Sequence, residues 1–206
     1  MNNIALIDYG AGNLASVRKG FAAVGAYLYS PSRPADLTHA KAIVVPGVGH
    51  FHATQALSGP WTTAIRAAIA DGIPLLGICL GLQWLFDGSD ESPGVPGLGL
   101  LKGRCTRLPA GQKVPHVGWN SLLVTRPSRL LAGVENGTQV YFAHSYGAPV
   151  SSECVAYTTH GTAFAAVVER DRVFGVQFHP EKSSVAGLRL LKNFVAFVGS
   201  VPVKST

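Results

Sequence analysis

The chain carries little charge for its length. Charged residues make up 14% of its 206 residues, against about 25% in a typical domain. Its net charge is +6, yet the nearest approach to a basic cluster is Arg18-Lys19 and the pair Arg104 and Arg107. Because nucleic-acid binding requires a clustered basic surface, we expect no nucleic-acid partner. The excess positive charge fits solubility or attraction to an acidic protein surface, and the low charge content fits a chain that buries surface against a partner.

Cysteine is also scarce and shows no pattern. The three cysteines, Cys79, Cys105 and Cys154, are odd in number and contain no C-x-x-C spacing. They therefore predict neither a disulfide framework nor a zinc site, and they fit a reducing compartment. We expect no bound metal.

Two further absences concern targeting and cofactors. No apolar run approaches the roughly 18 residues that span a bilayer, and residues 1–4 lack the basic segment of a secretory signal. The expected location is therefore cytoplasmic, without a membrane partner. Residues 9–13 resemble the start of a dinucleotide-binding G-x-G-x-x-G motif but lack the third glycine. We expect no cofactor.

Apolar runs alternate with helical periodicity along the first half of the chain. Strands that alternate with helices favour a parallel, doubly wound sheet. Strands are expected at residues 4–7, 27–29, 42–45 and 73–78, and helices at 14–24 and 61–70.

The second half changes to several short apolar segments. These predict an antiparallel extension of the sheet, followed by an amphipathic helix at residues 185–198. The short strands are expected at residues 121–124, 139–142, 154–157, 163–168 and 173–178. No linker or repeat divides the chain. We therefore predict one α/β domain over residues 1–206, with a central mostly parallel sheet flanked by helices.

Cys79 follows the predicted strand at 73–78 and lies between two glycines, Gly77 and Gly81. A cysteine after a buried strand is more often an inert core residue. Glycines two positions away on both sides, however, are typical of a nucleophile elbow, where a sharp strand-to-helix turn brings two backbone segments close together. The helix expected after the turn would favour the thiolate, and the Leu80 amide would point toward a developing oxyanion.

His179 and Glu181 follow the last predicted strand. Two positions apart on an extended chain, their side chains would leave the same face about 6.6 Å apart, so the carboxylate could orient the imidazole. On its own, an H-P-E segment is more often a surface loop without a function. Together with the elbow at Cys79, it predicts acyl-transfer chemistry on a carbonyl or amide.

A glycine-rich turn, Pro46-Gly47-Val48-Gly49, follows the strand predicted at 42–45. Alone it would be an ordinary turn. Because Asp8, Gly47 and Cys79 all come at the carboxyl ends of predicted parallel strands, they are expected to meet at one edge of the sheet. The turn is then a reasonable second half of an oxyanion hole.

Several segments together resemble a known family. The elbow, the 46–49 turn and the H-P-E segment resemble the class I (triad) glutamine amidotransferases. Within that class the chain is more specifically similar, over nearly its whole length, to the glutaminase subunits of imidazole glycerol phosphate synthases. This closer resemblance is carried by Ile7-Asp8-Tyr9-Gly10-Ala11-Gly12-Asn13-Leu14, Pro115-His116-Val117-Gly118-Trp119-Asn120 and His179-Pro180-Glu181-Lys182-Ser183.

The resemblance implies roles for individual residues. Cys79 would attack the side-chain amide of glutamine, His179 would transfer the proton to the departing ammonia, and Glu181 would orient His179. Val48 and Leu80 would donate the oxyanion-hole amides, after a rearrangement of the turn that depends on the partner. The residues implied in binding glutamine are Gly47, Gln83, Glu91, Ser145 and Tyr146.

The resemblance also implies a partner. Ammonia would pass, without release to solvent, to a (β/α)₈-barrel cyclase that forms imidazole glycerol phosphate and an aminoimidazole carboxamide ribonucleotide in histidine biosynthesis. Residues implied at that heterodimer interface are Asn13, Trp119, Asn120 and Lys182. Alternatives are a glutaminase subunit of another synthase, an independent cysteine hydrolase, or a binding module with a relic triad.

Overall fold

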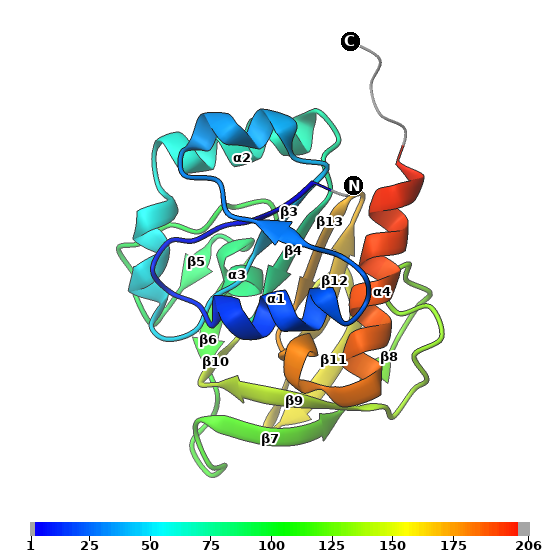
Figure 1. The fold of residues 1–206 in the computed structure, drawn as a ribbon. Helices are drawn as coiled ribbons and strands as arrows, with labels where there is room; N and C mark the ends of the chain where they lie inside the picture. Colours follow the sequence, from blue (N-terminus) through cyan, green and yellow to red (C-terminus); the bar gives the residue numbers. More distant parts are fainter. Residues whose placement is uncertain (1–2, 202–206) are drawn as a thin grey trace.

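The computed structural model describes residues 3–201 and contains one large mixed sheet (Figure 1). Five neighbouring strands run parallel, and the remaining three extend the sheet in antiparallel fashion. This confirms the predicted α/β class and the antiparallel extension. In spatial order the strands are β2 (Leu28–Tyr29), β1 (Ile4–Leu6), β3 (Ala42–Val45), β4 (Leu75–Ile78), β13 (Val173–Val176), β12 (Thr162–Arg170), β11 (Cys154–His160) and β8 (Leu123–Val124).

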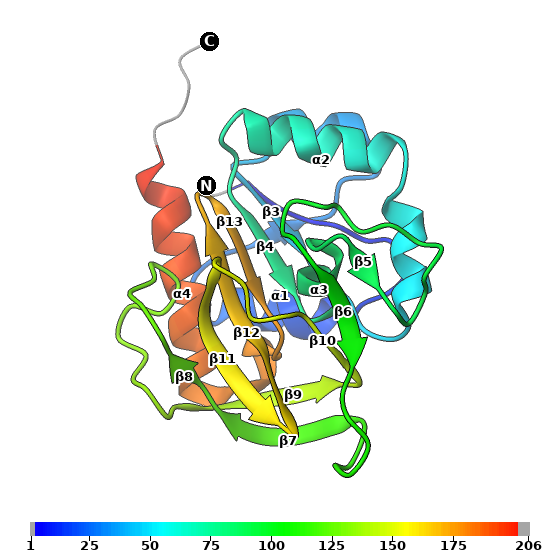
Figure 2. The same ribbon diagram turned by 180° about the vertical axis from the view of Figure 1, so that it is seen from behind.

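Helices cover both faces of this sheet. On one face α1 (Leu14–Ala22) and α4 (Ser184–Ser200) pack against alternate side chains of β1, such as Ile4 and Leu6 (Figure 1). On the other face α2 (Pro60–Ala70) and α3 (Leu80–Trp84) pack against the intervening side chains, such as Ala5 (Figure 2). Strands buried on two faces need continuous apolar runs, and this explains why β1, β3 and β4 are apolar at nearly every position.

Two smaller sheets complete the fold. One pairs β5 (Gly88–Ser89), β6 (Arg104–Arg107) and β10 (Tyr146–Gly147). The other pairs β7 (His116–Ser121) with β9 (Gln139–His144), and both views show this pair at the lower end of the molecule (Figures 1 and 2). The His179 amide, just beyond β13, donates to the Tyr141 carbonyl of β9 over 2.9 Å. The strand pair therefore lies across the carboxyl ends of the parallel strands.

The boundaries near β7 differ from those predicted. The sequence predicts a strand at 121–124, whereas β7 ends at Ser121 and β8 covers only two residues. Gly118 lies inside β7 with φ of 139°, and it breaks the run of apolar and β-branched residues that identifies a strand. Short 3₁₀ segments, absent from the predictions, are η1 (Pro34–His39), η2 (Phe51–Leu57) and η3 (Pro180–Lys182).

Candidate active site

Cys79 occupies a strained turn between β4 and α3. Its φ of 55° and ψ of −105° are unusual for a residue with a side chain. The neighbouring glycines are required sterically. A Cβ on Gly81 would overlap the carbonyl oxygen of Val45, and a Cβ on Gly77 would come within 2.6 Å of the Gly81 oxygen. The predicted elbow is therefore present, and it holds the Cys79 sulfur at the carboxyl end of the sheet.

His179 and Glu181 form a buried pair beside this turn. The distance from His179 Nδ1 to Glu181 Oε1 is 2.9 Å, and the two side chains are 4% and 2% exposed. The predicted pairing is present, but the predicted extended backbone is wrong. Only His179 is extended, while residues 180–182 form η3, because Pro180 favours the first position of a helical turn. The turn brings the carboxylate back under the imidazole.

The charge state of His179 is set by its neighbours. Burial lowers the pKa of His179, but hydrogen bonds to Cys79 and Glu181, together with their negative charges, outweigh burial and raise it to about 10. Since Nδ1 faces Glu181, the other ring nitrogen is the one available to the Cys79 sulfur. The structure thus brings together the three residues predicted as a triad, with the proton held on the imidazole.

Both predicted oxyanion donors are occupied by other acceptors. The Leu80 amide donates to the Gly47 carbonyl, and the Val48 amide donates to the Ala11 carbonyl, each over 3.3 Å. A backbone N–H that donates to a carbonyl of the same chain is not free to stabilise an oxyanion. An oxyanion hole built from these two amides, as the sequence resemblance implies, would require the 46–49 turn to rearrange.

Tyr9 is a further anchor of this turn that the sequence interpretation missed. Its hydroxyl donates to the Pro46 carbonyl over 2.8 Å. A Cβ on Gly47 would overlap the Tyr9 hydroxyl oxygen and come within 2.7 Å of the Leu80 Cβ, so a side chain at residue 47 would displace this anchor. Burial, and then the nearby Cys79, raise the pKa of the phenol, and it stays a neutral donor. No motif signalled this role, because the contact joins residues 37 positions apart.

The residues predicted to bind substrate surround the elbow. Gln83 is 4% exposed, and its amide nitrogen donates to the Tyr146 carbonyl over 2.7 Å. Glu91 accepts the Phe51 amide over 2.7 Å, at the start of the segment that follows the 46–49 turn. The Ser145 carbonyl accepts the Leu108 amide. The carbonyls of Ser145 and Tyr146 thus have partners within the chain.

The residues predicted to meet a partner do not all lie on one face. Trp119 is 53% exposed on β7 and packs edge-on against Tyr141, whose ring also lies 5.9 Å from the Lys182 ammonium. Asn13 is exposed and caps α1 by accepting the Ser16 amide. Asn120, which follows Trp119, is turned inward. Because successive residues on a strand face opposite sides, its amide donates to His116 Nε2 instead of facing out.

On the inward face of β7, His116 pairs with His144 of β9, a contact that the sequence did not predict. His116 Nδ1 lies 3.1 Å from His144 Nε2, and His144 Nδ1 lies 2.9 Å from the Tyr146 carbonyl. His160 stacks on His116 with 4.1 Å between ring centroids. Burial lowers the pKa of His144 to about 3 and, helped by nearby His160, that of His116 to about 4. Both rings are therefore neutral near pH 7.

These two histidines should make the stability of the chain depend on pH. An unfolded histidine binds a proton below about pH 6.5, whereas His116 and His144 resist protonation in the folded chain. The free energy of unfolding should therefore fall as the pH is lowered from about 6.5 toward about 3. Urea unfolding at a series of pH values measures this loss. His116→Gln should make it shallower, and identical pH slopes for variant and parent would contradict the explanation.

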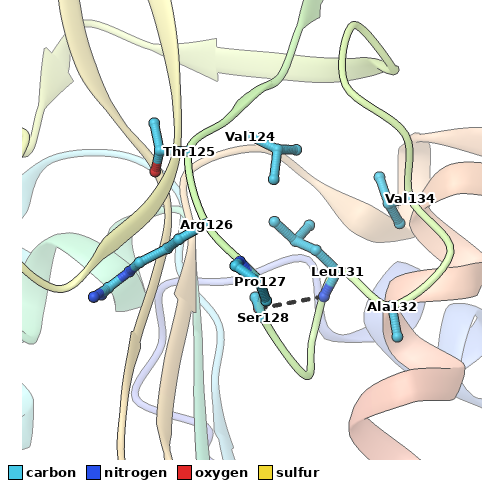
Figure 3. A pocket seen from close by; sticks show the side chains of 8 residues that line it. All are labelled: Val124, Thr125, Arg126, Pro127, Ser128, Leu131, Ala132 and Val134. Atoms are coloured by element: carbon cyan, nitrogen blue, oxygen red, sulfur yellow. Dashed lines mark hydrogen bonds between the residues drawn. The ribbon is translucent and has the colours of Figure 1, made fainter.

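A surface hollow of about 470 Å³ lies in the connection between β8 and β9 (Figure 3). Its wall includes Ser128, whose hydroxyl oxygen accepts the Leu131 amide, and the side chain of Arg126. None of its eight lining residues belongs to the triad or its surroundings. We therefore place the candidate active site at the triad and not in this hollow. Among residues 3–201, no cluster of three or more metal-ligating side chains occurs, and no helix has the length and hydropathy of a membrane span.

Comparison with known proteins gives a family for this arrangement. The family model described as glutamine amidotransferase class-I matches residues 5–197. The chain therefore belongs to the class-I glutamine amidotransferases. It is 47% identical to the imidazole glycerol phosphate synthase subunit HisH of Methanothermobacter thermautotrophicus, over 95% of this chain and 98% of that protein. Subunit HisH of Moorella thermoacetica is 48% identical, with 94% of both chains covered.

Solved structures agree on the fold. The structure of PurLQS from Thermotoga maritima superposes with a TM-score of 0.76 at 20% identity, covering 96% of this chain and all of that chain. A crystal structure of a glutamine amidotransferase superposes with a TM-score of 0.74, also at 20% identity, over 95% and 98% of the two chains. These matches support the class-I fold.

Proposed function

We propose that this chain is the glutaminase subunit of an imidazole glycerol phosphate synthase, hydrolysing glutamine to glutamate and ammonia. The observation that carries the proposal is the triad: a cysteine on a strained elbow, beside an imidazole held 2.9 Å from a buried carboxylate. The relatives that match nearly the whole chain at 47–48% identity bear the name of that synthase subunit. We further propose that residues 1–206 form one domain and that the protein acts in the cytoplasm.

The chemistry follows from the geometry of the triad. The Cys79 thiolate attacks the side-chain carbonyl carbon of glutamine and forms a tetrahedral oxyanion. The imidazolium of His179 gives its proton to the amide nitrogen as the carbon–nitrogen bond breaks, so that ammonia leaves and a glutamyl thioester stays on Cys79. His179 then takes a proton from water, which hydrolyses the thioester to glutamate. Glu181 keeps the imidazole oriented throughout.

The surrounding residues would bind and polarise the substrate. Glu91 supplies a carboxylate for the ammonium group of glutamine, and Gln83 lies one helical turn beyond the nucleophile. Gly47 and the backbone at Ser145 and Tyr146 would contact the same substrate. The amides of Val48 and Leu80 would stabilise the oxyanion after the 46–49 turn has released its present bonds.

Loosening this turn should activate the isolated chain. Tyr9→Phe removes the hydroxyl that holds the Pro46 carbonyl, and one hydrogen bond of this kind is worth a factor of about 2 to 10 in an equilibrium. We expect partner-free ammonia release from glutamine to rise by about that factor. The matched control is Tyr27→Phe, because the Tyr27 side chain is 80% exposed. Equal rates in the two variants would contradict the anchoring role of Tyr9.

The engaged oxyanion donors favour a subunit that works with a partner over an independent hydrolase. The partner in this proposal is a (β/α)₈-barrel cyclase, which uses the ammonia to form imidazole glycerol phosphate and an aminoimidazole carboxamide ribonucleotide. Trp119 and Lys182 would contact it together with Asn13. Val117, which is 56% exposed on β7, extends the apolar part of the same surface. The inward-facing Asn120 would support β7 from behind.

Ammonia release from glutamine tests this proposal, measured for the chain alone and with a candidate cyclase. We expect low release alone and a large increase with the cyclase and its ligand. Trp119→Ala should reduce that increase, whereas Val150→Ala, at an exposed apolar residue away from β7 and β9, should not. Rapid partner-free turnover of esters or peptides would instead favour an independent cysteine hydrolase.

A further inference from the structure

Gln177 is a buried polar side chain to which neither the triad nor the predicted substrate site assigns a role. It lies one residue beyond β13, and its side chain is fully buried. Its amide oxygen accepts Gln83 Nε2 over 3.1 Å, and its amide nitrogen lies 3.6 Å from the Cys79 sulfur. Gln177 therefore contacts both the nucleophile and a residue proposed to bind the substrate.

The direction of these hydrogen bonds follows from the Tyr146 carbonyl. A carbonyl can only accept, so the Gln83 side chain must present its nitrogen to Tyr146. The second hydrogen of that nitrogen then points at Gln177, which must accept it with its amide oxygen. The Gln177 nitrogen is left facing Cys79, and it donates a hydrogen to the sulfur.

The same carbonyl is fixed from a second side. His144 Nδ1 also donates to Tyr146, so His144 Nε2 accepts from His116 Nδ1. His116 Nε2 in turn accepts a hydrogen from Asn120. Two donors, on two separate branches, thus hold the Tyr146 carbonyl in place. Reversing the amide of Gln177 would place its oxygen against the sulfur and its nitrogen against a donor, a costly arrangement in a buried site.

We propose that Gln177 is a positioning residue that stabilises the Cys79 thiolate through an N–H···S hydrogen bond and sets its place relative to Gln83. A donor to the charged form of a group favours that form. The contact also restricts rotation of the sulfur, which has to face both the substrate carbon and His179. Because Gln83 and Cys79 bond to one rigid amide, the nucleophile and the substrate keep a fixed separation.

The inference rests on the proposed function for its reaction, but its first test does not require a substrate. The rate at which iodoacetamide alkylates Cys79 reports the fraction of its side chain present as thiolate. Peptide mass spectrometry distinguishes the Cys79 peptide from those of Cys105 and Cys154, which are also free cysteines. Gln177→Glu keeps the size and the acceptor for Gln83 but removes the donor and adds negative charge near the sulfur. We expect alkylation at pH 7 to slow by about 10- to 100-fold and its pH midpoint to move upward.

Kinetics with glutamine and the cyclase separate positioning from a merely structural role. Gln177→Glu should lower kcat by about 10- to 100-fold with KM changed less than about twofold, because Gln83 keeps its partner. Gln177→Met, which carries no charge and leaves Gln83 without that partner, should lower kcat and also raise KM. The matched surface control is Gln55→Glu at an exposed residue of η2. It introduces the same charge and should behave as the parent.

The outcomes are decisive in either direction. Alkylation at the parental rate and pH midpoint in a folded Gln177 variant would overturn the inference, even if the parent chain hydrolyses glutamine normally. If Gln177→Glu fails to fold, the rate and pH midpoint of Cys79 alkylation in Gln177→Met test the inference instead. A parent chain whose Cys79 alkylates rapidly but which releases no ammonia with any cyclase would refute the proposed function and leave the role of Gln177 standing.

Discussion

Replacing Cys79 by alanine should lower glutamine-dependent turnover of the assembled synthase by at least about 10⁴-fold, while turnover supplied with free ammonia survives. The sulfur is the only atom in the site placed to form the thioester, and neither His179 nor Glu181 can replace it. The elbow itself should persist, because alanine is smaller than cysteine. The cyclase reaction depends only on ammonia, whatever its source. Parallel assays with glutamine and with ammonium salt measure the two activities.

The control for this prediction is Cys154→Ala, at a buried cysteine of β11 that lies outside the site. It should retain both activities. If Cys79→Ala instead removed the ammonia-dependent activity as well, the proposed separation of glutamine hydrolysis from cyclisation would be wrong. If it left glutamine-dependent activity intact, the nucleophile would have to be sought elsewhere.

The second large effect is expected on stability. Gly81→Ala adds a methyl group that would overlap the carbonyl oxygen of Val45, an atom of the neighbouring β3 backbone. Neither segment can move without breaking the contact between the elbow and the central sheet. We expect a loss of about 3–5 kcal/mol in the free energy of unfolding, in the range of the most damaging single substitutions. Urea unfolding followed by circular dichroism measures it.

Gly199→Ala provides the comparison. Gly199 lies in the last turn of α4, and a Cβ there would meet no atom within 4 Å. Since alanine is the better helix former, this change should be neutral or stabilise the chain by up to about 1 kcal/mol. A Gly81 variant as stable as the Gly199 variant would show that the elbow is far less tightly packed than the structure describes.

Local sequence patterns were sufficient to predict much of the fold. The apolar runs that became β1, β3 and β4 are continuous because both faces of those strands are buried. The elbow could be predicted equally well, because the glycines on both sides of Cys79 mark a close backbone contact that leaves no room for a side chain. The H-P-E segment gave the right pair of residues. Its backbone was predicted wrongly, because a proline after an extended histidine can start a turn as readily as it continues a strand.

The parts that could not be predicted depend on contacts between distant segments. Gln177 and Cys79 are 98 positions apart, and their contact arises only because β4 and β13 are neighbours in the sheet. The histidine pair likewise requires the pairing of β7 with β9. Whether the Val48 amide faces the site or Ala11 depends on the orientation of a single peptide, which residue types do not determine. The inward turn of Asn120 toward His116 could not be predicted either, because its motif was not recognised as a strand with two faces.

The most direct test of the account is the acid-quenched mass of the Cys79 peptide after the chain has been mixed with glutamine and the cyclase. We predict a peptide heavier by one glutamyl group, formed in the first turnover and lost as glutamate appears, and absent in the Cys79→Ala variant. A glutamyl group found on another residue, or an unmodified Cys79 peptide at every time while glutamate accumulates, would contradict the account.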